Sequence, residues 1–324
     1  MRESLREEVG CIRGSRRAAS RHRRGLRGAL LGATVALALA GPARAEEPLW
    51  GEIAETLGKG FVNVTSRGRY AETVPFRHHG GAVLLTTARM DADLGIQYGL
   101  QPDVDLHLKL PYVSATIDEK FAGQTARHLI SGMGEMQMGA KWRFWQSMND
   151  RHKDELALMA DARLPTGDPN LTDEHGAIMP AHLQPNSGNA GLILGLAADR
   201  HFTMGGYWLS AMVTSEAPSH RYRRGDMLEL HASTGRRLRR LTRADQSDWM
   251  GIFGLHYHLM GKESEGGSTL RDSGGSDLDA ELGLATTKGS FGARFGVLVP
   301  MRVDYGLAHP PPGLEVQASV RGSF

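Results

Sequence analysis

The last eleven residues, Leu314-Glu-Val-Gln-Ala-Ser-Val-Arg-Gly-Ser-Phe324, decide the fold class of this 324-residue chain. Apolar residues stand at alternate positions, with polar or small residues between them. Successive side chains of a β-strand point to opposite faces of the sheet. The stretch therefore predicts a strand with one apolar face and one polar face, and the chain ends on an aromatic residue.

The same two-residue period recurs upstream. Every second residue is apolar in Val104–Leu110, Met136–Phe144 and Leu278–Leu284. A helix would need apolar spacings of three and four, which these stretches lack. We expect about twelve strands, near residues 59–70, 86–99, 102–114, 132–146, 154–164, 189–200, 203–214, 225–236, 248–260, 276–287, 290–304 and 313–324.

The links between these stretches alternate in length. The short and intermediate links are 100–101, 147–153, 200–202, 238–247 and 288–289, and the longer polar links are 71–85, 115–131, 165–188, 215–224, 261–275 and 305–312. Short turns on one rim and long loops on the other are typical of bacterial outer-membrane barrels. The sequence therefore predicts an all-β fold, a transmembrane antiparallel up-and-down β-barrel of about 12 strands. Its short turns are expected in the periplasm and its long loops outside the cell.

The first 45 residues are organised like a secretory signal peptide. Ten arginines and three acidic residues are followed by an apolar core over 29–41 and a small-x-small motif, which predicts cleavage between Ala45 and Glu46. The core is too short to span the roughly 30 Å of bilayer hydrocarbon as a helix. We expect a cleaved signal peptide (1–45), a short periplasmic N-terminal segment (46–58) and an outer-membrane β-barrel (59–324).

Charge and cysteine content exclude several classes of protein. After residue 45, 28 of the 38 Lys and Arg residues and 33 of the 36 Asp and Glu residues remain. The basic pI therefore belongs to the leader and does not indicate nucleic-acid binding. The one cysteine, Cys11, lies in that leader, so we expect no disulfide and no thiolate site in the mature chain. We expect no cofactor.

The expected partners follow from the barrel class. They are outer-membrane lipid, a small-molecule solute and the barrel-assembly machinery. The terminal strand ending in Phe324 resembles the C-terminal signal that this machinery reads.

If the apolar residues face lipid, the residues between them face the lumen. The predicted lumen-lining side chains are Arg89, Asp91, Asp93, Asp105, His107, Lys109, Lys141, Arg143, Asp161, Arg163, Glu229, His231, His256, His258, Asp277, Asp279, Glu281 and Arg294. Two interpretations stay open, because interspersed charges can pair and fill a lumen or can line a water-filled path. If a path exists, the run Asp277, Asp279 and Glu281 predicts a cation-favouring stripe.

Two groups of metal-ligating side chains are present without a complete ligand set. His256 and His258 share a face, and His231 lies on the preceding strand, but a metal would need further ligands. In the 165–175 loop, Asp168, Asp173 and Glu174 lack the spacing of a calcium loop. We expect no metal site, and we expect this loop to be solvated.

Several turn and strand-edge motifs occur in the order found in a known family. They are Gly99-Leu-Gln-Pro-Asp-Val-Asp-Leu106, Leu110-Pro-Tyr112, Gly132–Trp142, Leu164-Pro-Thr-Gly-Asp168 and Ser187-Gly-Asn189. Over roughly residues 80–324 the chain resembles the outer-membrane family described as "MetA-pathway of phenol degradation". Gly134-Glu135 stands where that family often has Gly-Asp. The resemblance implies a transporter or channel, in some members linked to aromatic-compound catabolism, and it supplies no catalytic residues.

The sequence thus predicts an outer-membrane channel or transporter for small solutes, with aromatic and other small organic compounds as candidates. One alternative is a plugged structural or adhesion barrel without transport. Another is an enzyme, because His231-Ala232-Ser233 resembles the His-x-Ser pair of the outer-membrane phospholipase. That pair faces lipid in the phospholipase, whereas Leu230 and Ala232 take the lipid-facing positions here. We therefore expect no enzymatic activity.

Overall fold

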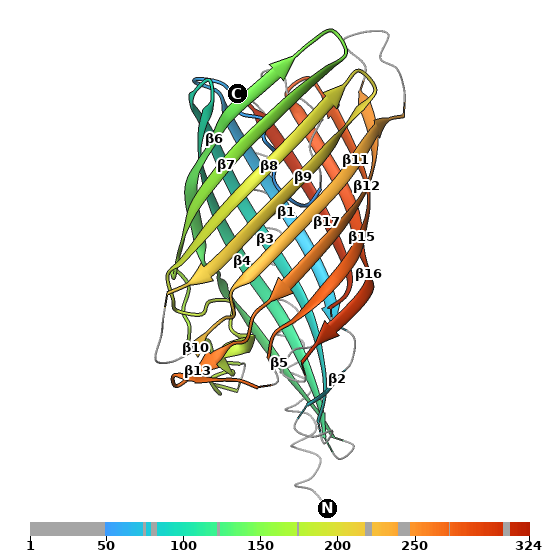
Figure 1. Cartoon of the computed structure of the whole chain (residues 1–324). Coiled ribbons are helices and arrows are strands. Elements are labelled where there is room, and N and C mark those ends of the chain that lie inside the picture. The colour runs from blue at the N-terminus through green and yellow to red at the C-terminus, as the bar shows by residue number, and fades with distance from the viewer. Residues whose placement is uncertain are drawn as a thin grey trace, which may run out of the picture. The chain divides into compact units, whose positions relative to one another are not determined.

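The computed structural model describes residues 49–73, 76–78, 83–121, 124–173, 175–217, 222–238, 247–271, 273–306 and 312–324. Within these residues, twelve long strands close into an antiparallel barrel (Figure 1). In their order around the wall they are β1 (Val62–Thr73), β3 (Val83–Gln101), β4 (Val104–Phe121), β6 (Met136–Met148), β7 (His152–Leu164), β8 (Gly191–Phe202), β9 (Gly205–Glu216), β11 (Met227–Arg237), β12 (Asp248–Met260), β15 (Gly275–Lys288), β16 (Phe291–Tyr305) and β17 (Pro312–Ser323).

The first and last strands close the wall. β17 pairs antiparallel with β1 from Asn63↔Ser323 onward, and β1 pairs with β3 on its other side. Beyond β17, the backbone N–H of Phe324 donates to the carbonyl of Val62 at 2.9 Å. Closure matters because backbone groups in hydrocarbon have no water to pair with, so only a sheet without edges can cross.

The two-residue period maps onto the two faces of this wall. Leu106, Trp142 and Leu282 are 41%, 53% and 52% exposed, whereas their neighbours Asp105 and Lys141 are almost fully buried. A continuous band of exposed large apolar side chains is stable only against lipid, and charged side chains face the interior. The predicted barrel and its place in the outer membrane are confirmed.

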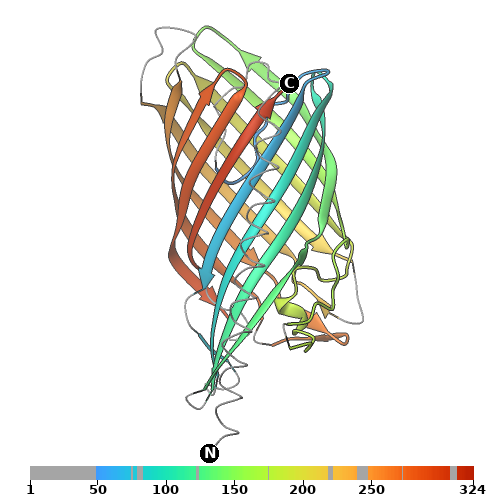
Figure 2. The ribbon, with the colours of Figure 1, turned by 180° about the vertical axis from the view of Figure 1, so that it is seen from behind.

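The loops are also sorted as predicted. The short turns and both ends of the barrel sequence lie at one rim, the periplasmic one, and the long connections lie at the other, as Figure 2 shows. A small sheet of β10 (Tyr222–Arg223), β13 (Ser264–Glu265) and β14 (Ser268–Thr269) belongs to these extracellular connections. In the described part of the chain there is no helix long and apolar enough to cross a membrane.

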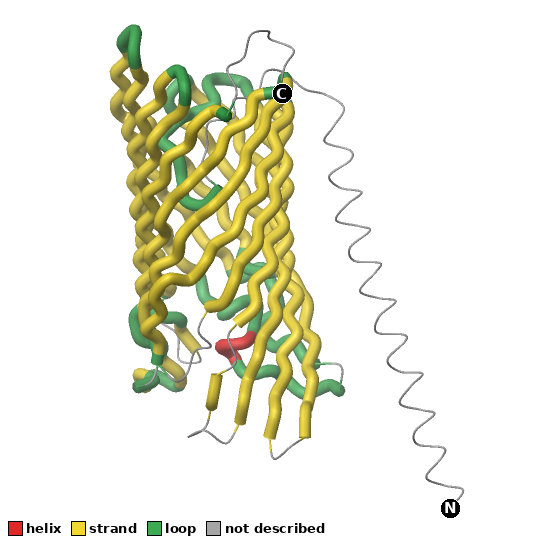
Figure 3. The backbone as a smooth tube through the Cα atoms, turned by 90° about the vertical axis from the view of Figure 1, so that its right-hand side faces the viewer, coloured by secondary structure: helices red, strands yellow, loops and turns green. Residues whose placement is uncertain are grey.

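One predicted loop contains strand instead. The range 115–131 continues β4 and then forms β5 (Gln124–Met133), which pairs with β4 from Tyr112↔Met133 to Phe121↔Gln124. A short strand, β2 (Phe76–His78), extends the same sheet beyond β3. The extension protrudes from the extracellular rim (Figure 3). It is held by a cluster in which Ile117 and Ile130 pack with Met179 of the 165–190 loop.

Candidate functional site

The predicted lumen residues all lie in described strands. Buried among them are Asp91, Asp105, Lys141, Arg163, His231, Asp277, Asp279 and Glu281. Half-buried are Asp93, His107, Lys109, Arg143, Asp161, Glu229, His256, His258 and Arg294. Arg89 is exposed and lies 2.8 Å from Asp91.

The lumen is not empty, because residues 49–58 run through it. We call residues 49–58 the lumen segment. It leaves the periplasmic end of the wall at Gly60, whose N–H donates to the carbonyl of Gly99 at 2.7 Å, and it folds back into the barrel (Figures 1 and 2). The expectation of a periplasmic segment over 46–58 is therefore wrong for the described part, 49–58. Residues 46–48, and the predicted cleavage site between Ala45 and Glu46, lie outside the described residues.

Carboxylates of the wall accept the backbone N–H groups of the lumen segment. An irregular segment away from water must find such acceptors, because an unpaired buried N–H costs about 1–3 kcal/mol. The donor–acceptor pairs are Leu49 N–Glu281 Oε1 (3.1 Å), Ala54 N–Asp199 Oδ2 (2.8 Å), Glu55 N–Asp199 Oδ2 (3.2 Å) and Leu57 N–Asp105 Oδ2 (3.1 Å). Three of the buried acidic residues are thus positioned to hold the segment.

Further polar contacts fix the direction of the segment. The Gln317 amide donates to the carbonyl of Leu49 at 2.8 Å, and the Lys141 ammonium donates to the carbonyl of Glu55 at 2.5 Å. The indole N–H of Trp50 donates to Glu315 at 2.9 Å. These contacts come from β6 and β17, so the segment is tied to widely separated parts of the wall.

Apolar packing completes the docking. Leu49 and Trp50 are buried in a cluster with wall residues of β9, β12, β15 and β16. The wall side chains of that cluster are Trp208, Met250, Ile252, Ala285 and Leu298. Leu49 lies over Gly283 and Gly296, where any Cβ would overlap its side chain. These two glycines therefore form the seat of Leu49.

Gly51 allows the closest approach of the segment to the wall. Its φ is +77°, in the left-handed region that favours glycine, and a Cβ on it would overlap the His231 ring and Ser210. His231 itself lies 2.5 Å from Glu281. His231 and Ser233 of the His-Ala-Ser motif are therefore buried inside the barrel, while Leu230 faces outward and is 40% exposed.

Asp277 and Glu281 of the acidic stripe on β15 contact other protein groups. Asp277 lies 3.3 Å from His258 and accepts the hydroxyl of Tyr305, and Glu281 holds His231 and the lumen segment. The ring centroids of His231 and His256 are 6.2 Å apart. In the ranges that the structure describes, no group of three or more His, Cys, Asp or Glu side chains is placed to hold a metal ion.

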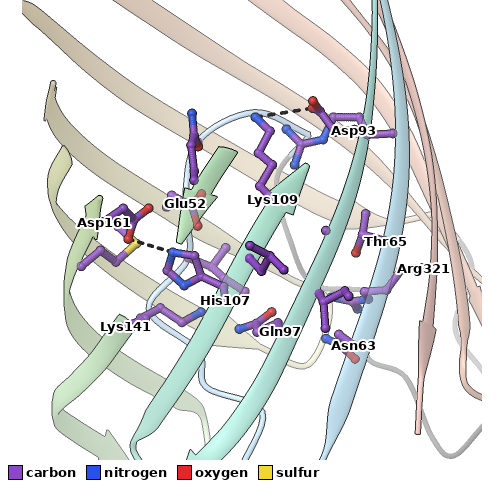
Figure 4. A pocket seen from close by; sticks show the side chains of 18 of the residues that line it. Glu52, Asn63, Thr65, Asp93, Gln97, His107, Lys109, Lys141, Asp161 and Arg321 are labelled. Carbon is purple, nitrogen blue, oxygen red and sulfur yellow. Dashed lines mark hydrogen bonds and ion pairs between the residues drawn. The ribbon is translucent and has the colours of Figure 1, made fainter. Parts of the chain in front are cut away.

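A cavity of about 180 Å³ remains beside the lumen segment (Figure 4). One side of it is formed by residues of the segment and the other by β1, β3, β4, β6, β7, β16 and β17. An ion pair, Lys109–Asp93 at 3.4 Å, and a hydrogen bond between His107 and Asp161 at 2.8 Å cross its surface. The described lumen thus contains a filled part and an open part, and the open part is lined by charged groups.

A second buried network lies at the extracellular mouth. Glu135 is 3.5 Å from Arg163 and 3.0 Å from Arg224, and its other oxygen accepts the N–H and hydroxyl of Ser187. Glu216 lies 3.8 Å from Arg163 and 3.7 Å from Arg224. These ion pairs tie the loops after β7 and β9 to the wall. Arg163 was predicted to line the lumen, and its partners come from these loops and strand ends.

The 165–190 loop is held by a buried carboxylate rather than solvated as a whole. Asp173 is 6% exposed and accepts from His128 at 2.8 Å and from the N–H groups of His175 and Ala177 at 2.9 Å each. The hydrogen bond from His128, together with the two N–H donors, lowers the pKa of Asp173 to about 2. Asp168 accepts a local N–H, from Asn170, and is exposed. Glu174 lies outside the described residues.

We expect Asp173→Asn to loosen this loop several-fold, measured by amide exchange of residues 171–186 in the reconstituted protein. The loss of the charged acceptor weakens all three hydrogen bonds. Asp168→Asn is the matched control and leaves exchange unchanged. Because the pKa of Asp173 is depressed, its contribution is complete above about pH 4 and is lost as the pH falls towards 2. Equal exchange in both variants would contradict this role.

Several residues of the site were not singled out from the sequence. Asp199, Ser210 and Gln317 hold the lumen segment, and Trp208 is fully buried against it. All four lie on the inward face by alternation. The sequence offers one further sign that the segment docks. Leu49 and Trp50 are a pair of large apolar residues between the predicted cleavage site and the first strand, and such a pair is expected to pack on an apolar surface.

The comparisons with known proteins agree with this architecture. An outer-membrane channel from Pseudomonas putida F1 aligns with a TM-score of 0.63 and 13% identity, covering 86% of this chain and 100% of that one. The chain folds as an outer-membrane β-barrel. At this identity the likeness establishes the fold alone.

Other solved barrels align less well. The β-domain of the Bordetella autotransporter BrkA covers 82% of this chain and 100% of its own, with 11% identity and a TM-score of 0.43. The transport unit of the autotransporter AIDA-I from Escherichia coli covers 86% and 95%, with 12% identity and a TM-score of 0.46. Scores at this level carry no argument. Neither a protein-family model nor a curated protein matches the sequence.

Proposed function

We propose that this protein is an outer-membrane channel for small solutes, and that solutes pass through the lumen beside the lumen segment. The observation that carries the proposal is the charged cavity between residues 49–53 and the wall. A barrel built only as a rigid support has no need of an open polar space, since buried charges are costly unless they are paired or wet. We assign no enzymatic role.

The class of solute is part of the proposal. Small organic compounds, aromatic ones included, fit a cavity of about 180 Å³, because a cavity of roughly 150 Å³ accommodates benzene. The motif order from Gly99 to Asn189 supports a place in the "MetA-pathway of phenol degradation" family. The fold shared with the P. putida channel is compatible with it. We further propose that Phe324 is part of the signal for the assembly machinery.

Single-channel recording in planar bilayers tests the proposal. The refolded mature chain is expected to give discrete steps of small conductance, because the lumen segment leaves only a narrow path. A sample with heat-modifiable gel mobility, and hence a folded barrel, that gives no steps in any of many insertions would favour the plugged structural barrel. Boiled protein at the same detergent concentration is the control for leakage.

A further inference from the structure

A shallow groove of about 500 Å³ lies on the lipid-facing side of the wall, over β11, β12, β15 and β16. Gly251 lines it and takes an outward position between Trp249 and Phe253, which are both exposed. A Cβ added at Gly251 would come no closer than 3.4 Å to any atom beyond its chain neighbours, and that atom belongs to Leu238. One glycine thus leaves a gap in the band of large apolar side chains.

The neighbouring strands give this groove apolar sides. Gly251 is paired with Leu284 of β15, and Leu284 is paired with Phe295 of β16. Both of these side chains, and Leu282 beside them, line the groove and are exposed. Because this face of the wall meets hydrocarbon, a groove with apolar sides fits an acyl chain.

Arg236 lines the same groove from β11, where it is paired with Gly251. By alternation from the exposed Leu230 it lies on the lipid-facing side of the strand, and it is itself exposed. Its neighbour Arg237 lies 2.9 Å from Asp248, whereas no ion pair or side-chain hydrogen bond of Arg236 is found in the described part of the chain. An arginine on a lipid-facing surface is costly unless it lies near the interface or meets an anion.

Arg236 lies at the level of the periplasmic headgroups. It is the last residue but one of β11, which ends at the periplasmic rim. Two exposed aromatic residues lie diagonally across from it on the neighbouring strands, Tyr207 and Trp249. The ring centroid of Tyr207 is 5.2 Å from that of Phe202 at the turn between β8 and β9. Aromatic girdles mark the interfaces of outer-membrane barrels, so the guanidinium is within reach of lipid phosphates.

We propose that this groove binds an anionic glycerophospholipid of the periplasmic leaflet. The phosphate lies against Arg236, and one acyl chain lies over Gly251 beside Phe253 and Leu284. Guanidinium groups form paired, charge-assisted hydrogen bonds with phosphate oxygens and keep their charge at any physiological pH. The quaternary ammonium group of phosphatidylcholine offsets the charge of its phosphate, whereas phosphatidylglycerol has no such cation. The inference does not depend on the proposed channel, because the groove is on the outer face of the wall.

Native mass spectrometry of the refolded mature barrel tests the charge preference. The detergent contains equal amounts of phosphatidylglycerol and phosphatidylcholine with the same acyl chains. We expect one phosphatidylglycerol molecule to be retained about fivefold more often than phosphatidylcholine, the effect of one arginine near a membrane surface. Arg236→Gln is expected to lose this preference. Arg200→Gln is the matched control, since Arg200 is exposed on the outward face near the same rim but is bonded to Asp154 at 2.7 Å and 2.9 Å.

Filling the groove tests the place of the acyl chain. Gly251→Leu is expected to reduce the retention of both lipids several-fold while heat-modifiable mobility is kept. Gly68→Leu is the matched control, because Gly68 is an outward-facing glycine of β1 that has open space around it and does not line the groove. Equal retention of the two lipids by the unmodified barrel, or a preference that survives Arg236→Gln, overturns the proposal. Retention by folded Gly251→Leu that equals that of Gly68→Leu overturns it as well.

Discussion

Deletion of residues 49–57 is expected to raise the single-channel conductance of the barrel several-fold. The lumen segment is bound to the wall by hydrogen bonds to Asp105, Asp199 and Glu281 and by the packing of Leu49 and Trp50. Because it occupies the lumen and forms one side of the cavity, its removal widens the path along which ions move. The wall keeps all twelve strands, so heat-modifiable mobility is expected to be retained.

The same deletion is expected to change ion selectivity. It frees the three carboxylates that accept backbone N–H groups of the segment and leaves them facing water. Cation preference is therefore expected to rise relative to the unmodified chain. The control is a variant in which residues 49–57 have a scrambled order, because it keeps the length of the chain before the barrel but loses the specific contacts with the wall. Unchanged conductance after deletion would show that the segment does not limit the path.

A side chain added at Gly296, which forms the seat of Leu49 together with Gly283, is also expected to raise the single-channel conductance. In Gly296→Val the new Cβ overlaps Leu49, and Trp50 lies 3.0 Å from the same point. The segment cannot dock as it does now, so we expect larger and noisier conductance steps. Gly292→Val is the matched control on the same strand and inward face, since a Cβ there makes ordinary contact with Thr287 at 3.5 Å.

Leu49→Ala tests the seat from the other side without changing the wall. Leu49 is 4% exposed, and truncation of a buried leucine to alanine costs about 2–5 kcal/mol. The segment is then expected to leave the lumen for part of the time, visible as transitions between the native and the enlarged conductance. If both Gly296→Val and Leu49→Ala conduct as the unmodified chain does, the docking described here does not control the path.

The strands of the barrel wall were predictable because the alternation that defines them involves only residues close together in the sequence. A strand with lipid on one face and lumen on the other must alternate, so β12 was expected at 248–260 and is found at Asp248–Met260. The expected and observed bounds of β7 differ by two residues at the start and none at the end. The same alternation predicts which residues of each strand point towards the lumen.

What the sequence did not reveal depends on contacts between distant residues. Leu49 and Glu281 are 232 positions apart, and no periodic pattern over 49–58 reports that the segment docks inside the barrel. β5 was missed because its stability comes from Ile130 packing with Ile117 and with Met179 of another loop. The charged side chains were singled out from the alternation, but their partners, such as Arg143 with Asp103 and Glu155 at 2.5 Å each, required the fold.

The central claim, that residues 49–58 lie inside the barrel, is tested most directly by a Leu49→Cys/Gly296→Cys variant. The only cysteine of the chain, Cys11, is in the predicted leader, so the mature variant has just these two thiols. Because the Leu49 side chain fills the space over Gly296, we expect cysteines at these two positions to come close enough to form a disulfide. We predict that outer-membrane preparations yield a disulfide-linked peptide pair by non-reducing mass spectrometry, and that Leu49→Cys/Gly292→Cys does not. Two free thiols in the first variant would place the segment outside the lumen and contradict the account.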